Sequence, residues 1–117
     1  MNTYKGHCHC GAISFTFKYE AIKEGITCNC SICKRKGAIM SAFVLSPDEF
    51  DIKAESKNLG QYQFDTKIAK HYFCKTCGIY PFHQTMRKPG FYRVNLGCID
   101  EVDTSTLKLD LFDGKNI

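Results

Sequence analysis

The stretch KHYFCKTCG, residues 70–78, runs from a strand-like pattern into two cysteines that are separated by two residues and followed by a glycine. A turn of this kind lets both thiolates point at one metal ion, and its glycine permits the positive φ that aims backbone N–H groups at sulfur. Two thiolates do not complete a tetrahedral site. The sequence therefore calls for a second pair of ligands from another part of the chain.

The natural second pair lies in CHCG, residues 8–11, which is also closed by a glycine and also borders a strand-like pattern. Together the two stretches supply four thiolates, the ligand number of a closed zinc site. Such a site leaves no coordination position for a substrate, so we predict a structural zinc. Its ligands would be Cys8, Cys10, Cys74 and Cys77.

A third cluster, CNCSIC at residues 28–33, contains three cysteines and has no obvious partner pair. Three protein ligands, with a fourth position open to water or substrate, are the arrangement of a catalytic zinc. We therefore predict a catalytic zinc on Cys28, Cys30 and Cys33. The two assignments together predict two zinc ions per chain.

Other interpretations of the cysteines stay open at this stage. The second site would be structural if a fourth protein ligand completed it, whereas a redox role for the C-x-x-C pair lacks the βαβ pattern expected around it. Cys98 lies between Gly97 and Ile99 in a strand-like pattern, which favours a small buried hydrophobic side chain. The residues that could complete the second site are Cys98, His7, His9, His71 and His83.

The KRK stretch, residues 34–36, directly follows the three-cysteine cluster. A charge run is most often a solvated loop. Beside an open zinc site, however, its positive charge would attract an anionic substrate, and we predict Lys34 and Arg35 as contacts of that substrate. Further cations that could add to this charge, although the sequence does not place them there, are Arg87, Lys88 and Arg93.

The bulk composition excludes several classes of protein. The 117 residues are 44% hydrophobic and 24% charged, and no apolar run approaches the length of a membrane span. The formal net charge of +4 would favour nucleic acid, but seven thiolates and two Zn²⁺ ions change it by −7 and +4 to about +1. We expect no nucleic-acid partner and no membrane. Eight cysteines, seven of them in metal-type clusters, with no signal-peptide pattern at the start, predict a cytoplasmic protein.

Alternation of apolar and polar residues predicts many short strands and few helices. The clearest case is ISFTFKY, residues 13–19, which has the period of two of a strand with one buried face. Pro81 would confine its segment to a sheet edge or a bulge, and SPDEF, residues 46–50, predicts one helical turn. We expect a mostly β fold with a single domain over residues 1–117. The further predicted strands are 38–45, 60–66, 70–74, 79–85, 91–100 and 107–112.

Four motifs follow one another along the chain: CHCG at 8–11, CNCSICKRKG at 28–37, FCKTCGIYPFH at 73–83 and RVNLGCID at 93–100. As a set they resemble the glutathione-dependent formaldehyde-activating enzyme family, which also has centromere-protein-V-like members. The resemblance implies an Mss4-like β-tent fold with zinc-binding knuckles. It also implies the two metal sites predicted above, with the four-cysteine site structural and the three-cysteine site catalytic.

The activity that the resemblance implies is that of a carbon–sulfur lyase, the reversible condensation of glutathione with formaldehyde to S-hydroxymethylglutathione. We therefore expect a zinc-dependent enzyme that acts on an adduct of a small thiol such as glutathione with an aldehyde. Zinc would act as a Lewis acid. His71 and His83 are candidates for the proton acceptor because imidazoles titrate near neutrality.

Relatives with the same fold supply two alternatives. One is a zinc-stabilised binding module without turnover, in which protein ligands fully coordinate the second zinc. The other is a methionine sulfoxide reductase, which needs a separate reactive cysteine. Cys98 is the candidate for that role, but its apolar surroundings argue against a low thiol pKa.

Overall fold

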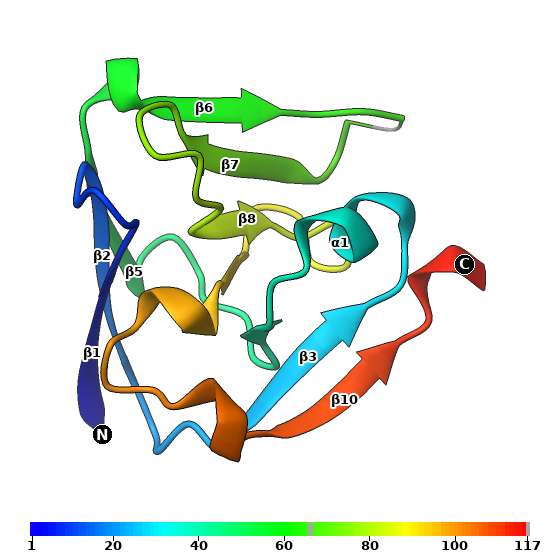
Figure 1. The fold of residues 1–117 in the computed structure, drawn as a ribbon, viewed down its shortest axis with the longest axis horizontal. Coiled ribbons are helices and arrows are strands. Elements are labelled where there is room, and N and C mark those ends of the chain that lie inside the picture. Colours follow the sequence, from blue (N-terminus) through cyan, green and yellow to red (C-terminus); the bar gives the residue numbers. More distant parts are fainter. Residues whose placement is uncertain (66, 117) are drawn as a thin grey trace.

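Three small sheets meet around one core (Figure 1). The computed structural model describes residues 1–65 and 67–116. The first sheet is antiparallel and has the order β1-β2-β5. Its strands are β1 (Asn2–His7), β2 (Ile13–Tyr19) and β5 (Phe50–Ala54).

The second sheet has the order β10-β3-β4 and joins the two ends of the sequence. β3 (Glu24–Cys28) pairs in parallel with β10 (Lys108–Phe112) and antiparallel with the short β4 (Met40–Ser41). The register of β3 and β10 sets Phe112 opposite Cys28. The last residues of both strands therefore lie side by side, where β3 leads into helix α1 (Ser31–Lys36) (Figure 1).

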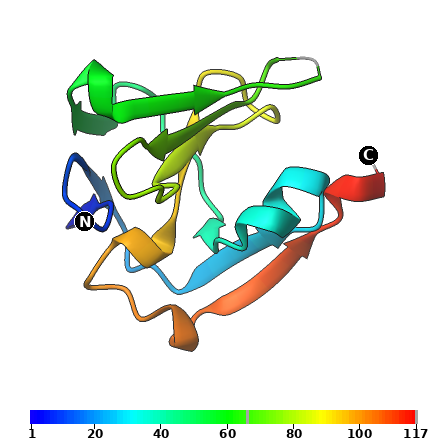
Figure 2. The ribbon, with the colours of Figure 1, turned by 45° about the horizontal axis from the view of Figure 1, so that its top comes forward.

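The third sheet is antiparallel and has the order β6-β7-β8-β9. Figure 2 shows it across from β3, β10 and α1. Four short 3₁₀ segments complete the described elements: Ser56–Asn58, Leu96–Cys98, Thr104–Thr106 and Gly114–Asn116. The strands of this sheet are β6 (Leu59–Tyr62), β7 (Lys70–Cys74), β8 (Phe82–Gln84) and β9 (Tyr92–Val94).

An aromatic core holds the first and third sheets together. Phe15 on β2 is 1% exposed, and its ring centroid lies 5.3 Å from that of Phe50 on β5 and 6.2 Å from that of Phe82 on β8. Burying one such side chain stabilises the fold by about 1.5–3 kcal/mol. The radius of gyration, 13.4 Å, is that of one compact unit of this length.

The prediction of a mostly β fold is confirmed. β2 has the predicted alternation of buried and less buried residues, and β7 and β10 match their predicted segments to within one residue. Among the described residues, no helix is long and apolar enough to cross a membrane.

Several predicted strands are shorter than their apolar patterns. Within 38–45 only Met40–Ser41 is a strand, and Leu45 makes an isolated bridge to Tyr92. The segment 91–100 leaves the sheet after Val94 because the Asn95 side chain accepts a hydrogen bond from the Gly97 N–H and starts a 3₁₀ turn. Beyond Val94, Leu96 and Ile99 are buried without strand pairing.

The predicted strand 60–66 is also shorter than its pattern, because β6 ends at Tyr62. The last residue of that prediction, Thr66, lies outside the described residues.

Two local predictions are wrong. β8 is an inner strand, and Pro81 lies just before it, so the missing N–H of proline does not interrupt the ladder. Residues 46–50 form one hydrogen-bonded turn, Glu49 N–H to Ser46 O at 3.0 Å, and not a helix, since β5 begins at Phe50.

Four elements were missed in the sequence patterns, and each has a short or weak signal. α1 has only six residues, too few for a helical period. β1 has two buried residues among six, and β3 has one among five. The fourth missed element is β5, whose five residues include one that is buried.

Replacing the central aromatic residue tests the core. Phe15→Ala is expected to lower the free energy of unfolding by about 3–5 kcal/mol, because it leaves a cavity between the two sheets. Phe73→Ala is the matched control, since Phe73 is 37% exposed, and it should cost less than half as much. Urea denaturation followed by far-UV circular dichroism measures both, and equal losses would contradict this core.

Candidate functional site

Two glycine-closed loops bring the four-cysteine cluster together, namely Cys8, Cys10, Cys74 and Cys77. In each loop the N–H of the first cysteine donates to the carbonyl five residues on, Cys8 to Ile13 O at 3.0 Å and Cys74 to Ile79 O at 2.9 Å. The glycines have positive φ, +83° at Gly11 and +78° at Gly78, as the sequence predicts. The two loops therefore share this closing hydrogen bond and a glycine of positive φ, although their cysteines are spaced differently.

The sulfur atoms of this cluster are spaced as ligands of one ion. Cys10 Sγ lies 3.7 Å from Cys8 Sγ and 3.6 Å from Cys74 Sγ, and all four sulfur atoms lie within 4.8 Å of one another. Four sulfurs at about 2.3 Å from a tetrahedral zinc are roughly 3.8 Å apart. A disulfide would need about 2.05 Å. The donor set and its spacing fit a zinc ion.

Backbone N–H groups point at these sulfurs. Cys74 Sγ accepts from Thr76 N at 3.4 Å and from Cys77 N at 3.5 Å, and the Cys77 bond contributes most to lowering the pKa of Cys74. Burial raises the pKa of Cys77, but backbone hydrogen bonds from Cys10 and Ile79 outweigh it and lower that pKa to about 6. The second loop thus favours the thiolate form of Cys74 and Cys77, the form that binds a metal.

The three-cysteine cluster (Cys28, Cys30 and Cys33) lies where β3 leads into α1. Its sulfur atoms also lie within 4.8 Å of one another, and its residues are half-buried. Among the described residues, no further Cys, His, Asp or Glu joins this group. The cluster can hold a metal ion with three thiolates and leave one position open.

A cavity of about 510 Å³ opens on this cluster and is lined by residues from the second and third sheets and from α1. Such a volume is within the usual range of small-molecule sites. Its apolar wall includes Ile26, Met40, Phe64 and Phe112, and its polar wall includes Lys36, His71, His83, Thr85, Arg87 and Arg93.

The charged side chains on the cavity wall are cations, and no Asp or Glu is among the described residues that line it. Arg93 is fixed by hydrogen bonds from Nη1 to Ser41 O at 2.8 Å and to Ala42 O at 2.9 Å. Arg87 stacks on the Phe112 ring, with Cζ 4.5 Å from the ring centroid. The wall is therefore complementary to an anion.

Lys36, at the end of α1, connects the cysteines to two histidines. Its Nζ lies 4.0 Å from the centroid of the Tyr80 ring and 3.4 Å from His83 Nδ1. His71 Nδ1 hydrogen-bonds to the Tyr80 hydroxyl. Burial, followed by the Lys36 charge, lowers the pKa of His71 to about 4 and that of His83 to about 2. Both imidazoles are neutral at pH 7.

The cations that the sequence singled out divide between cavity and surface. Lys34 and Arg35 are exposed and are not among the residues that line this cavity, so their contact with a substrate stays a prediction. Lys36, Arg87 and Arg93 line it. Helix geometry explains the difference, because successive residues of α1 point in different directions.

The other residues offered as ligands lie elsewhere. Cys98 is 6% exposed and belongs to the core, as predicted, and burial raises its pKa to about 12. His7 Nε2 lies 3.3 Å from Asp100 Oδ2, and His9 is exposed. None of these three belongs to either cysteine cluster.

The sequence did not point to three residues beside the cluster. Asn29 lies between two of its cysteines. Phe112, the last residue of β10, and Gly114, just after that strand, line the cavity. No local pattern links residues so far apart. The strand register that joins them exists only in the folded chain.

A β-rich Mss4-like fold that carries two cysteine clusters defines the class of this protein. The family model for glutathione-dependent formaldehyde-activating enzyme matches residues 3–113. The chain belongs to this family. The structure is also similar to the crystal structure of a Rhodobacter sphaeroides protein from structural genomics, with a TM-score of 0.82 and 34% identity. The match covers 92% of this chain and 99% of that chain.

The lowered imidazole pKa values lead to a prediction. His71 and His83 should keep neutral-imidazole shifts between pH 8 and pH 5, because protonation would place a second cation beside Lys36 in a buried site. His7, whose pKa is raised above its ordinary value by hydrogen bonds to the Cys8 backbone and to Asp100, should titrate in the same series. Long-range ¹H–¹⁵N NMR spectra report each ring, and titration of His83 near pH 6.5 would refute the assignment.

Proposed function

We propose that this protein is a zinc-dependent carbon–sulfur lyase that acts on the adduct of a small thiol with an aldehyde, of the S-hydroxymethylglutathione type. The observation that carries the proposal is the three-cysteine cluster, which opens on a cavity with a cationic wall. Family membership supports the same chemistry.

Each chain holds two zinc ions in this proposal. The four-cysteine cluster holds a structural zinc, because four thiolates fill a tetrahedron. Cys28, Cys30 and Cys33 hold the catalytic zinc. Soft thiolate donors suit zinc better than magnesium or calcium, which prefer oxygen ligands. When bound there, zinc supplies a Lewis acid that favours the thiolate form of a substrate or polarises its carbonyl oxygen.

The reaction is balanced without a further reactant. In condensation a carbon–sulfur bond forms, the carbonyl π bond breaks, and the thiol proton ends on the resulting hydroxyl oxygen; the lyase direction reverses these changes. His71, whose imidazole is neutral at pH 7 and has the higher pKa of the two, accepts and returns that proton. His83 is the weaker base, because burial and Lys36 lower its pKa to about 2. Lys36 holds His83 in place through Nδ1 and keeps positive charge beside the reacting oxygen.

Glutathione fits the cavity by charge and size. It carries two carboxylates, which Arg87 and Arg93 attract, and the cavity volume of about 510 Å³ suits a ligand larger than formaldehyde. All eight cysteines are free, the usual state in a reducing compartment, and we assign the protein to the cytoplasm. A single domain over residues 1–117 carries the whole site.

Loss of one cysteine tests the division into structural and catalytic zinc. In Cys28→Ser, zinc should fall from two ions per chain to one, and turnover of glutathione with formaldehyde should fall at least about 100-fold, since a ligand matters more than an outer-shell partner. Cys98→Ala is the matched control, because Cys98 lies in neither cluster, and it should keep both zinc ions and turnover.

Zinc is measured by mass spectrometry and turnover by consumption of free formaldehyde on the same folded samples. Full turnover in Cys28→Ser would refute the proposed chemistry. Two tightly held zinc ions in the wild type without any turnover would favour the zinc-stabilised binding module.

The cationic wall yields a second prediction about the substrate. Arg87→Ala should raise KM for glutathione by about 10-fold, equivalent to about 1.4 kcal/mol, with a smaller change in kcat. Lys88→Ala is the matched control, because Lys88 stacks on Phe91 and does not line the cavity. Glutathione diethyl ester, which lacks both carboxylates, should show no such difference. An equal effect of Arg87→Ala on acid and ester would exclude carboxylate binding by Arg87.

A further inference from the structure

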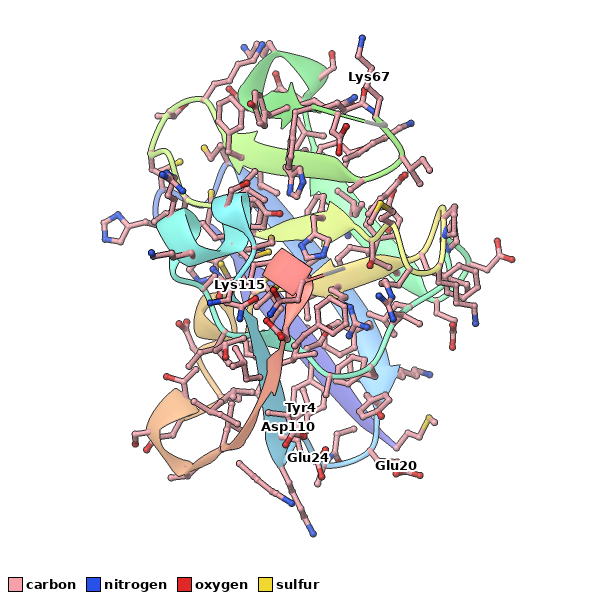
Figure 3. The ribbon with its side chains drawn as sticks, turned by 90° about the vertical axis from the view of Figure 1, so that its right-hand side faces the viewer. Tyr4, Glu20, Glu24, Lys67, Asp110 and Lys115 are labelled. Atoms are coloured by element: carbon pink, nitrogen blue, oxygen red, sulfur yellow. The ribbon has the colours of Figure 1, made fainter. Side chains whose placement is uncertain are left out.

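A short turn at residues 113–116 packs directly on the three-cysteine cluster. It follows β10 and contains the 3₁₀ segment Gly114–Asn116. In Figure 3 the labelled Lys115 of this turn lies next to α1, whereas the labelled Glu24 marks the other end of β3. Figures 1 and 2 show the same neighbourhood of α1 and the end of the chain's last described strand. We call residues 113–116 the 113–116 turn.

Asn29, which separates Cys28 from Cys30, binds this turn through its side chain. Its Nδ2 donates to Asp113 Oδ1 at 2.7 Å, and its Oδ1 accepts from the Lys115 N–H at 3.0 Å. Its own backbone N–H donates to Phe112 O at 3.3 Å. One half-buried residue thus makes three hydrogen bonds to a segment more than 80 positions away.

The turn has its own internal support. Asp113 Oδ2 accepts from Asn116 Nδ2 at 2.6 Å, so both carboxylate oxygens are used, one within the turn and one by Asn29. The turn therefore presents a fixed acceptor to Asn29. An amide satisfied at both ends holds its backbone in one orientation more firmly than a single bond does.

Gly114 closes the contact from the other side. A Cβ at this position would lie 2.7 Å from Cys28 Sγ, a distance that real Cβ atoms essentially never show, and 3.1 Å from the Cys30 Cβ, which is a tight contact. The backbone of the turn is thus packed against the Cys28 side chain with no room to spare. Phe112 and Gly114 also line the cavity, so the same segment forms one of its walls.

We propose that Asn29 is a positioning residue that ties the 113–116 turn to the three-cysteine cluster and thereby holds Cys28 and Cys30 in the geometry that binds the metal. This inference rests on the proposed function, in which that cluster holds zinc. Asn29 touches neither substrate nor metal. It acts through the two cysteines on either side of it.

The coupling works in both directions. If the turn raises the affinity of the cluster for zinc, then zinc stabilises the turn by the same factor. The four-cysteine cluster should not share this dependence, since the described contacts of the 113–116 turn do not include its residues. The metal that the turn controls is the one on the cavity.

Zinc release to a chromogenic chelator tests the proposal. The wild type should release zinc in a fast phase from the three-cysteine cluster and a slow phase from the four-cysteine cluster. Asn29→Ala should speed the fast phase by about 10- to 100-fold, the usual effect of losing an outer-shell partner, and leave the slow phase unchanged. Gly114→Ala should act in the same direction, because its methyl group displaces Cys28 Sγ.

Asp103→Ala is the matched control, since its carboxylate supports another exposed turn, with Oδ1 accepting from Ser105 N at 3.0 Å. It should change neither phase. Hydrogen exchange at the Lys115 amide gives a readout of the reverse coupling. That amide should exchange at least about 10-fold faster in Cys28→Ser than in the zinc-loaded wild type.

The outcomes separate this proposal from the proposed function. An unchanged fast phase in Asn29→Ala, or equal acceleration of both phases, overturns the positioning role. The lyase proposal still stands in that case, provided that the wild-type protein turns over glutathione with formaldehyde. If Cys28→Ser releases zinc in the same two phases as the wild type, the metal assignment is overturned, and this proposal falls with it. The expected result is selective loss of the cavity metal in both Asn29→Ala and Gly114→Ala.

Discussion

The convergence of four sulfur atoms from two distant loops is the constraint on which the rest of the structure depends. Cys8 and Cys10 lie between the first two strands, and Cys74 and Cys77 lie at the end of β7, with Cys10 Sγ and Cys74 Sγ only 3.6 Å apart. This contact joins the first sheet to the third. The aromatic core then fills the space between them, so packing and sulfur positions support the same arrangement. A small domain with a modest core benefits from such a link, because a metal held there adds binding free energy to folding.

In the proposed function, the second cysteine cluster uses the same ligand chemistry for a different purpose. Its three thiolates lie at the junction of β3 and α1, where the second and third sheets face each other across the cavity. Three positive side chains on the wall offset the negative charge of the thiolates and leave an anion-binding surface. The two buried imidazoles are neutral because burial opposes their charged form. Soft ligand atoms, cationic walls and neutral bases in one cavity are the combination that thiol and aldehyde chemistry requires.

Local patterns in the sequence predict the observed structure correctly. The glycine-closed cysteine pairs predicted loops that the structure shows, down to the positive φ of Gly11 and Gly78. The alternation in β2 predicted its buried face because one side of that strand is wholly in the core. The sequence patterns do not reveal α1, which is too short to show a helical period. They also mislead at Pro81, because its position just before an inner strand depends on where strand pairing begins. The apolar run 38–45 was read as one strand because periodicity cannot distinguish buried loop from buried strand.

By itself the sequence determined the fold class, the family and the grouping of the seven clustered cysteines, because ligand number and spacing are properties of short segments. Only the tertiary structure decided which other side chains surround the three-cysteine cluster. It placed Lys36, Arg87 and Arg93 on the cavity wall and left Lys34 and Arg35 at the surface. It also brought Gly114 against Cys28, since the parallel register of β3 and β10 sets residues more than 80 positions apart side by side. Such contacts follow from strand pairing across the whole chain, and no local pattern encodes them.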